Sequence, residues 1–533
     1  MIFESKKQVK FYKENNFRKK MVEQTIENNQ NRIFNRHEDI LFVPDLESCQ
    51  DRRFAIGVLS IAGYLREKGY NSKIIEMHKL LNWNHKYAYF NKKEKARLKK
   101  LLFDSIIKAN PKILCFSPVT RKFNESMDLM EELKPLTNAK IIVGGYHANI
   151  LPLDFFKYKK DIVDFVVYGE GELSMHELID AIDKGDDFSK IDGVVWKNNE
   201  GEIIKNSPRA MIADLDILPM PAYDMIDLNF YLSMWDGNVR GIPLRSLAMI
   251  TSRGCPFSCT FCTCNQVFGR KIRMRSPAKV EEEIKFLKEK YDIEGVWYCD
   301  DALTNNLGHF KEICHIMKKY NLVWGCQGRI DAVSHDVAKA MSAAGGVQMD
   351  FGVESGSDRI LKDVIKKGFR VEAVKKAFDI LKQYNVRYLA NFMVGFPTET
   401  REEFEMTKKL AFDIDADFYA TFITVPELGT ELYKRMELNV EPKDYWKLER
   451  SNWHFTSDPS IFNQSEIKNL EEEYTNFTNQ LIKKIIWKGL KHIPFYIGLW
   501  LKLPKKTQRM GYMVKKIYKI FIFDRLSSRI MKI

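Results

Sequence analysis

Long apolar runs are absent from this 533-residue chain. No stretch reaches the ~18–20 consecutive apolar residues that span a bilayer, and the polar segment 1–20 lacks the apolar core of a signal peptide. The sequence therefore predicts an intracellular, cytoplasmic protein without a membrane-spanning helix. Internal repeats and low-complexity blocks are also missing, and the length favours two or three ordinary globular domains.

Acidic residues are scarce at one end of the chain. The segment 480–533 holds fourteen Lys and Arg residues against one acid, Asp524, and so accounts for the whole net charge of +13. The rest of the chain is not basic, so we expect no nucleic-acid partner, and RNA binding by the tail is the weakest alternative. Basic residues mixed with aromatics in 481–503 suit an amphipathic segment on anionic lipid, at the inner face of a membrane. A helical appendage packed on the protein explains the same pattern equally well.

Cysteines are too few, nine in all, and too unevenly spaced for a secreted disulfide framework. Four of them, Cys255, Cys259, Cys262 and Cys264, lie within ten residues. Three thiolates spaced C-x3-C-x2-C on a tight loop can ligate three irons of a [4Fe–4S] cluster and leave the fourth iron open. A zinc ribbon would need a second C-x2-C knuckle, which is absent, and this favours the cluster over zinc. A zinc site or unreactive thiols are the alternatives to the cluster. The spacing predicts Cys255, Cys259 and Cys262 as metal ligands and leaves the role of Cys264 open.

The hydrophobic pattern indicates an α/β fold with two sheet domains. Five short apolar strands interleaved with helices predict a doubly wound, Rossmann-like parallel sheet, and six later strand–helix units predict a partial (β/α)6 barrel open on one side. Ligands bind at the carboxyl ends of such strands. The expected divisions are a polar arm (1–38), the first domain (39–188), a connector (189–245), the barrel (246–430) and a helical C-terminal region (431–533). The expected strands are 40–44, 73–77, 113–117, 140–143 and 162–168, then 247–250, 295–298, 323–327, 348–353, 388–394 and 418–424.

The cysteine motif follows a predicted strand and carries an aromatic residue, Phe261, directly before its last cysteine. With polar stretches at 298–304, 327–331, 351–357, 391–399 and 425–430, each at a strand end, it resembles the radical S-adenosylmethionine (SAM) superfamily over about 247–430. Leu303 stands where the related stretch usually has Phe.

This resemblance implies that SAM chelates the open iron and is cleaved to a 5′-deoxyadenosyl radical, with an external reductant of the flavodoxin or ferredoxin type. It implies that Glu354 binds the ribose of SAM and that Asp300 and Arg329 lie near its amino-acid end. Phe261 and Ser355 are further expected cofactor contacts.

Three turns of the first domain, at residues 116–120, 143–148 and 167–172, resemble those of the cobalamin-binding domain that precedes the barrel in one branch of this superfamily. Their glycines let the backbone approach a flat macrocycle. The Asp-x-His-x-x-Gly signature is absent, so cobalt would carry no protein histidine, and His147 could at most border the corrin. An ordinary flavodoxin-like domain without cobalamin is the alternative. The expected cobalamin contacts are Ser117, Thr120, Gly144, Gly145, Gly169 and Glu170.

Together these resemblances imply a cobalamin-dependent radical SAM methyltransferase that methylates an unactivated carbon of a small-molecule or lipid-like substrate. A radical cyclase or rearrangement enzyme of the same architecture, like the anaerobic magnesium-protoporphyrin monomethyl ester cyclase, is one alternative. A non-catalytic iron–sulfur or corrinoid-binding protein is another. No residue identifies the substrate.

Overall fold

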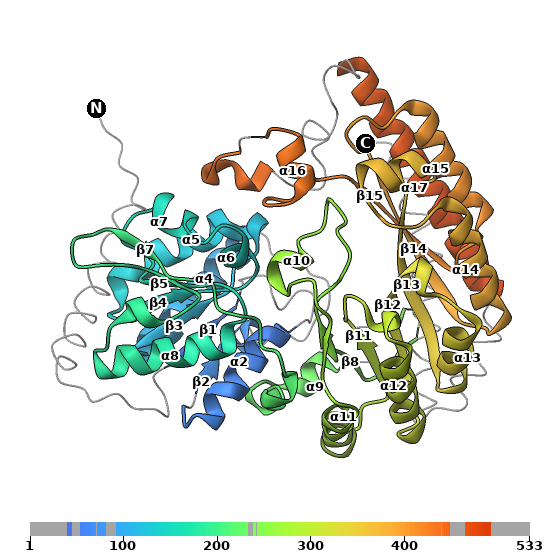
Figure 1. The fold of residues 1–533 in the computed structure, drawn as a ribbon. Coiled ribbons are helices and arrows are strands. Elements are labelled where there is room, and N and C mark those ends of the chain that lie inside the picture. The colour runs from blue at the N-terminus through green and yellow to red at the C-terminus, as the bar shows by residue number, and fades with distance from the viewer. Residues whose placement is uncertain are drawn as a thin grey trace. The chain divides into compact units, whose positions relative to one another are not determined.

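The structure is a computed structural model in which residues 40–44, 54–70, 72–80, 92–232, 238–240, 242–438, 440–447 and 464–491 are described. Its contacts divide the chain into two compact units, each of which is described by itself (Figure 1). The first unit contains Met1–Leu228, Arg253–Arg275 and Val425–Asn452, and the second contains Asn229–Ser252, Ser276–Thr424 and Trp453–Ile533. The loop with the three cysteines therefore belongs to the first unit.

A seven-stranded sheet forms the centre of the first unit, with the described strands in the order β2-β1-β3-β4-β5-β6-β7. Strands β1 to β5 pair in parallel, whereas β6 and β7 are antiparallel. The predicted doubly wound sheet is confirmed, but residues 194–205 of the expected connector extend it as β6 and β7, because Phe165 of β5 pairs with Trp196 of β6. The strands are β1 (Ile40–Val43), β2 (Ser72–Ile74), β3 (Ile113–Phe116), β4 (Lys140–Val143), β5 (Phe165–Val167), β6 (Val194–Lys197) and β7 (Ile203–Lys205).

One hydrophobic cluster joins this sheet to two helices. It includes Ile40 and Phe42 of β1 and Ile113 of β3, which face the same side because alternate residues of a strand do so. Leu65 of α2 and Leu178 of α8 complete it. The helices of this unit are α2 (Ile56–Glu67), α3 (Met77–Leu80), α4 (Lys92–Ala109), α5 (Phe123–Leu133), α6 (Tyr146–Ile150), α7 (Asp154–Lys157), α8 (Gly171–Lys184), α10 (Cys264–Val267) and α16 (Glu431–Arg435), and α9 (Leu228–Tyr231) begins where the unit ends.

Six parallel strands form the sheet of the second unit, in the order β15-β14-β13-β12-β11-β8. The two outer strands, β15 and β8, are not paired with each other in the described sheet. This arrangement confirms the predicted partial barrel, open on one side. The strands are β8 (Ser246–Met249), β11 (Gly295–Tyr298), β12 (Val323–Gly328), β13 (Gly346–Glu354), β14 (Arg387–Val394) and β15 (Phe418–Ile423), and β9 (Ser252–Arg253) and β10 (Arg273–Met274) form a separate two-stranded sheet.

Most helices between the barrel strands begin at a side-chain cap. Ser276, Asn306 and Ser334 each accept a backbone N–H three residues further on, at the starts of α11, α12 and α13. Thr400 and Glu403 form a capping box at the start of α15. These caps fix where each helix begins after its strand-end loop. The helices are α11 (Pro277–Tyr291), α12 (Leu307–Lys319), α13 (His335–Ala343), α14 (Val371–Gln383), α15 (Arg401–Asp413) and α17 (Gln464–Lys491).

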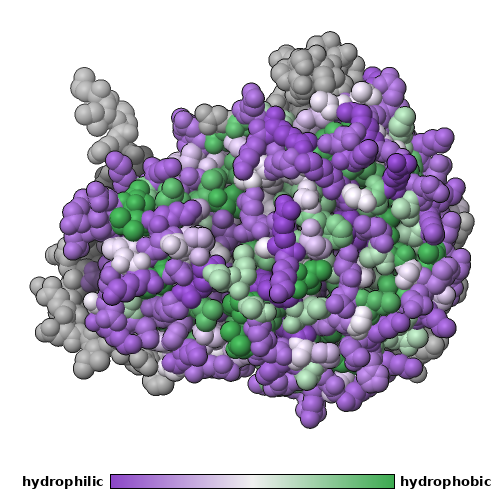
Figure 2. Space-filling view, in the orientation of Figure 1, coloured by the Kyte–Doolittle hydropathy of each residue, from purple (hydrophilic) through white to green (hydrophobic). Residues whose placement is uncertain are grey.

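The last described helix, α17, packs beside β15 and α15 (Figure 1). Its Phe477 and Leu481 are each 1% exposed, whereas Trp487 is 68% exposed. Among the described residues no helix is both long and apolar enough to cross a bilayer. The molecular face in Figure 2 is mainly hydrophilic, with hydrophobic residues in small separate groups. The polar arm predicted for 1–38 and the tail beyond 491 lie outside the described residues.

Candidate active site

The three predicted cluster ligands lie on one loop of the first unit. This cysteine loop, residues 254–272, runs from β9 through the short helix α10 to β10 and carries Cys255, Cys259 and Cys262. The N–H of Cys262 donates to the carbonyl oxygen of Cys259 at 3.1 Å, so a tight turn separates the last two cysteines. Cys255 and Cys259 are half-buried and Cys262 is exposed. All three can therefore be reached from solvent.

Two contacts shape the loop around its thiols. Gly254, directly before Cys255, has φ +102°, and a β-carbon there would collide with the carbonyl oxygen of Lys271. Only glycine fits this position without strain. The N–H of Cys264 donates to Sγ of Cys262 at 3.4 Å, and hydrogen bonds to cysteine sulfur are among the features that set the potential of iron–sulfur clusters. Cys264 thus acts on its neighbour through its backbone.

The donor chemistry of the cysteine loop fits an iron–sulfur cluster. Over the described residues no three Cys, His, Asp or Glu side chains already converge on a metal-sized point, so the thiols are not preassembled. They are nevertheless soft thiolate donors on one loop, which is the ligand type that holds an iron–sulfur cluster. Cys115 and Cys326 differ, because burial raises the pKa of their thiols and keeps them protonated.

The Gly-Glu-Gly-Glu turn, residues 169–172 at the start of α8, holds the cysteine loop. Oε1 of Glu170 accepts a hydrogen bond from Nη1 of Arg253 at 2.8 Å, and Oε2 accepts one from Nη1 of Arg273 at 2.7 Å. Nη2 of Arg253 also donates to Oε1 of Glu172 at 2.6 Å. Both carboxylate oxygens of Glu170 therefore bind arginines at the two ends of the cysteine loop. Contact between Glu170 and cobalamin stays a prediction.

The predicted cobalamin contacts Ser117, Gly144 and Gly145 meet at the carboxyl ends of β3 and β4. The N–H of Gly144 donates to the carbonyl oxygen of Phe116 at 2.9 Å. Gly145 has φ +83°, and Oγ of Ser117 occupies the space that a β-carbon would need. Glycine at position 145 therefore makes room for the Ser117 hydroxyl at this edge, and contact of these three residues with cobalamin stays a prediction.

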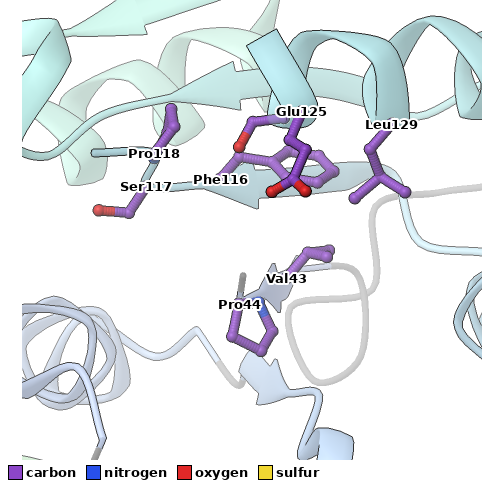
Figure 3. Close-up of a pocket in the computed structure, with 8 residues that line it drawn as sticks. Val43, Pro44, Phe116, Ser117, Pro118, Glu125 and Leu129 are labelled. Atoms are coloured by element: carbon purple, nitrogen blue, oxygen red, sulfur yellow. The ribbon is translucent and has the colours of Figure 1, made fainter. Parts of the chain in front are cut away.

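A small pocket opens at this edge, between the ends of β1 and β3 and helix α5 (Figure 3). Ligands of doubly wound sheets bind in crevices at the carboxyl ends of their strands, so the pocket has the position expected for a bound cofactor. Its lining includes Val43, Pro44, Phe116, Ser117, Glu125 and Leu129.

His147 is fully buried in an aromatic cluster. The centroid of its ring lies 4.5 Å from that of Phe123 and 5.4 Å from those of Phe155 and Tyr445. Its Nδ1 is 3.1 Å from Oγ1 of Thr120, and burial lowers its pKa to about 3, so the ring is neutral. Thr120, which we predicted as a cofactor contact, directs its hydroxyl to His147 and is 2% exposed. His147 is thus a packed core residue.

Two turns of the first unit are tied down by side chains. Gly169 has φ +87°, and its N–H donates to Oδ1 of Asn149. The hydroxyl of Tyr146 lies 2.7 Å from Oγ1 of Thr263, one residue after Cys262. Burial raises the pKa of Tyr146 to about 12, so this phenol stays protonated. The contact joins the glycine turn after β4 to the cysteine loop.

Asp300, in the second unit, follows β11 and is 1% exposed. Its Oδ1 accepts hydrogen bonds from N and Oγ1 of Thr251, at 2.9 Å and 2.8 Å, and from Oγ of Ser252 at 2.6 Å. Its Oδ2 is buried and makes no hydrogen bond within the described residues. Burial raises the pKa of Asp300 to about 6. One oxygen therefore fixes the segment after β8, and the other is left for a ligand.

Glu354 and Arg329 meet through Lys367. Glu354 ends β13 with φ +70°, a conformation rare outside glycine, and its Oε1 accepts from Nζ of Lys367 at 2.7 Å. Nη2 of Arg329 donates to the carbonyl oxygen of Lys367 at 2.6 Å. Arg329 also forms a two-pronged pair with Asp331, with both distances 2.9 Å. The structure thus gathers two of the predicted SAM contacts into one buried group.

Two other predicted contacts differ in their surroundings. Ser355 is fully buried, and its Oγ accepts the N–H of Ser357 at 3.1 Å and lies 3.3 Å from Oγ1 of Thr407. Its hydroxyl therefore shapes the turn after β13. Phe261 is half-buried on the cysteine loop, and its cofactor role stays a prediction.

Sequence reasoning missed Arg253 and Glu172 in the first unit and Lys367 in the second. The run of Lys366 and Lys367 was visible, but nothing in the sequence shows which lysine turns toward Glu354. Arg253 lies 81 positions from Glu172, a separation that no local pattern spans. The one signal in the sequence that could have identified Arg253 was its position two residues before Cys255.

Comparison with known proteins agrees with both units. Residues 249–411 match the Radical SAM superfamily and residues 52–179 match the B12 binding domain family. An uncharacterized methyltransferase of Pyrococcus horikoshii is 31% identical over 416 residues, which cover 77% of this chain and 84% of that protein. The anaerobic magnesium-protoporphyrin IX monomethyl ester cyclase of Rubrivivax gelatinosus is 27% identical over 340 residues, covering 62% of this chain and 59% of the cyclase.

A solved structure shares the fold. The radical S-adenosylmethionine methyltransferase TsrM from Kitasatospora setae, with cobalamin and a [4Fe–4S] cluster bound, superposes with a TM-score of 0.59 at 16% identity, covering 75% of this chain and 78% of that one. Both family matches, the relative of 31% identity and the two-unit architecture lead to one assignment. The chain belongs to the cobalamin-binding branch of the radical SAM superfamily, and it is an enzyme whose cofactors are a [4Fe–4S] cluster, SAM and cobalamin.

Proposed function

We propose that this enzyme methylates an unactivated carbon of a small-molecule substrate by a radical route. One observation carries the proposal. The cysteine loop and the glycine-lined strand edge belong to the same unit and touch through Tyr146 and Thr263, whose oxygens are 2.7 Å apart. A radical source and a methyl carrier held side by side in this way can serve one substrate.

In this proposal each residue of the site has a distinct role. Cys255, Cys259 and Cys262 hold the cluster. When bound, the cluster supplies the electron that cleaves SAM, and the corrinoid carries the methyl group. Glu354 accepts hydrogen bonds from the ribose hydroxyls of SAM. The unpaired Oδ2 of Asp300 receives the ammonium group, because a buried carboxylate oxygen gains most from a charged donor.

A cyclase or rearrangement activity is the second candidate. The match to the magnesium-protoporphyrin cyclase supports it, because that enzyme is 27% identical to this chain over 340 aligned residues. Methylation is preferred because the relative of 31% identity carries the name of a methyltransferase. The two activities differ in whether a methyl group from SAM enters the product.

The core of the proposal is tested by anaerobic purification, cluster reconstitution and incubation with SAM and dithionite. The wild type should bind about four irons per chain and release 5′-deoxyadenosine. The variants C255A, C259A and C262A should lose both properties. C264A is the matched control and should keep both, because the substitution leaves in place the backbone N–H that donates to Sγ of Cys262. An intact cluster in the wild type without 5′-deoxyadenosine would contradict the proposal.

Methyl transfer needs a separate readout. With methylcobalamin added, the protein should retain corrin absorbance through gel filtration. SAM deuterated at its methyl group should then place label in the product when a cell extract supplies the substrate. Formation of 5′-deoxyadenosine without any labelled product, in an extract that consumes SAM, would favour the cyclase. The enzyme also needs an external one-electron reductant, for which we propose a flavodoxin or ferredoxin.

Peripheral membrane contact through the basic tail is also kept as a proposal. Within the described part, Nζ of Lys484 donates to the carbonyl oxygen of Phe412 at 2.6 Å, and Nζ of Lys488 lies 3.3 Å from Oδ2 of Asp415. These lysines therefore pack on the barrel, while Trp487 is exposed. Deleting 492–533 should reduce cosedimentation with anionic vesicles if the remainder of the tail binds lipid, and unchanged cosedimentation would remove the idea.

A further inference from the structure

We propose that the ion-pair network of Glu170, Glu172, Arg253 and Arg273, here called the clamp, positions the cysteine loop on the cobalamin-binding domain so that the loop can take up its cluster. This inference rests on the proposed ligand role of the three cysteines. It assigns to the Gly-Glu-Gly-Glu turn a task other than contact with cobalamin.

The clamp grips the cysteine loop at both ends. Arg253 stands two residues before the first cysteine, and Arg273 stands where the loop returns in β10. Glu170 binds both arginines, one through each carboxylate oxygen. The side chain of Glu170, at the start of α8, therefore fixes the distance between the two ends of the cysteine loop. A shift of Glu170 would move both ends of that loop.

The charged side chains of the clamp are buried, so each of them needs its partner. The side chains of Glu170 and Glu172 are 2% and 4% exposed, and that of Arg253 is 14% exposed. Burial alone would raise the pKa of Glu172, but the charge of Arg253 and its hydrogen bonds lower it below the ordinary value. Removing one partner leaves an uncompensated buried charge, so the arrangement holds only when it is complete.

Neutral groups complete the clamp and tie it to the domain. Oγ of Ser60, on α2, donates to Oε1 of Glu172 at 2.7 Å. The N–H of Ile212 donates to Oε2 of Glu170 at 2.7 Å, and its carbonyl oxygen accepts from Nη1 of Arg273 at 2.8 Å. The carboxylate of Glu170 thus makes three hydrogen bonds within the protein, which leaves it poorly suited to a ligand.

The test compares E170Q, E172Q and R253K with the wild type after anaerobic reconstitution. Gln keeps the shape of Glu without its charge, and Lys keeps the charge of Arg without its fork. E177Q is the matched control, because Glu177 lies on the same helix α8 and pairs with Arg209 with its side chain 43% exposed. We would measure iron and sulfide content, the rate of iron loss to a chelator, the EPR spectrum of the reduced cluster and retained corrin absorbance.

The clamp variants should lose iron about tenfold faster or more, the range typical when residues that orient metal ligands are changed, with an altered EPR spectrum. They should retain cobalamin, and E177Q should match the wild type. Unchanged iron retention in E170Q, E172Q and R253K would overturn the clamp, as would loss of cobalamin from E170Q with the cluster intact. If E172Q loses its circular dichroism signal and is therefore unfolded, iron retention in the conservative variant R253K decides whether the clamp holds the loop.

Failure of the clamp and failure of the proposed function give different results. A wild type that takes up no iron contradicts the ligand assignment itself, and the clamp falls with it. A wild type that takes up iron, together with clamp variants that hold it equally well, contradicts the clamp alone.

Discussion

Nζ of Lys367 lies 2.7 Å from Oε1 of Glu354, and the two side chains are 11% and 7% exposed. Gly352 leaves the space for this pair, because a β-carbon there would collide with the carboxylate of Glu354 and lie 2.6 Å from Nζ of Lys367. The carboxylate that we expect to meet SAM is therefore oriented before any ligand arrives. A side chain held in this way loses less conformational freedom on binding.

Replacement of Lys367 should weaken SAM binding. In K367M the partner of Glu354 is lost, and its carboxylate becomes free to rotate or to take up a proton. We expect the dissociation constant for SAM to rise about tenfold or more, since truncating one partner of a buried charge pair costs at least 2 kcal/mol. Equilibrium dialysis with the reconstituted enzyme measures it. K362M, at an exposed lysine of the same segment, is the control, and equal affinities in both variants would contradict the role of Lys367.

Asp300 offers a way to separate folding from binding. D300N keeps the oxygen that accepts hydrogen bonds from Thr251 and Ser252 and removes the charge at Oδ2. The variant should still unfold cooperatively, because the hydrogen bonds at Oδ1 are kept, whereas SAM affinity should fall about tenfold or more because a charge-assisted hydrogen bond is lost. Denaturant unfolding and dialysis provide the two values. D336N, at a surface ion pair with Lys311, should change neither.

Wild-type affinity of D300N for SAM would contradict the proposed contact between Asp300 and SAM. That result would leave Asp300 as a purely structural residue that fixes the segment after β8.

The contact between Tyr146 and Thr263 should be measurable as a coupling energy. Y146F and T263V each remove one hydroxyl of the pair, and the double variant removes both. We expect a coupling of about 0.5–1.5 kcal/mol in the free energy of unfolding, the usual net value of a buried hydrogen bond. Strictly additive effects of the two substitutions would mean that the contact does not hold the cysteine loop against the glycine turn.

Glu399 should give the second unit a distinctive pH dependence. Its Oε2 accepts from the N–H groups of Gly395 at 2.5 Å and Phe396 at 3.1 Å, and burial raises its pKa to about 8. The folded state therefore holds a proton that the unfolded chain releases near pH 4–5, the ordinary range of Glu at about 4.3. Stability contributed by the protonated form is present at low pH and is lost as the pH rises from that range through about 8.

The substitution E399Q tests this directly, because Gln does not titrate. Relative to E399Q, the wild type should lose stability progressively between pH 5 and pH 9, as followed by thermal melting at half-unit steps. E402Q is the control, because Glu402 is exposed on the neighbouring helix. Parallel stability curves for wild type and E399Q over this range would show that Glu399 is ionised in the folded protein.

Local sequence determined the elements and the cysteine motif. The strands predicted at 140–143 and 295–298 coincide with β4 and β11, because a short apolar run bounded by polar residues has few other conformations in a folded protein. The loop that carries Cys255, Cys259 and Cys262 follows from their spacing, and the glycines at 144, 145 and 169 lie at turns as expected. Each of these features depends only on neighbours in the chain.

Tertiary structure alone decided the roles of the charged residues. Glu170 stands in a turn that sequence assigns to cobalamin, yet Arg253 and Arg273, 83 and 103 positions away, occupy its carboxylate. Lys367, in the segment after β13, meets Glu354 at the end of that strand, although the neighbouring Lys366 was equally eligible from the sequence. Hydrophobic periodicity specifies which face of an element is buried, but a buried charge must find its partner across the fold. Partner choice therefore emerges only when strand ends and loops have been brought together in space.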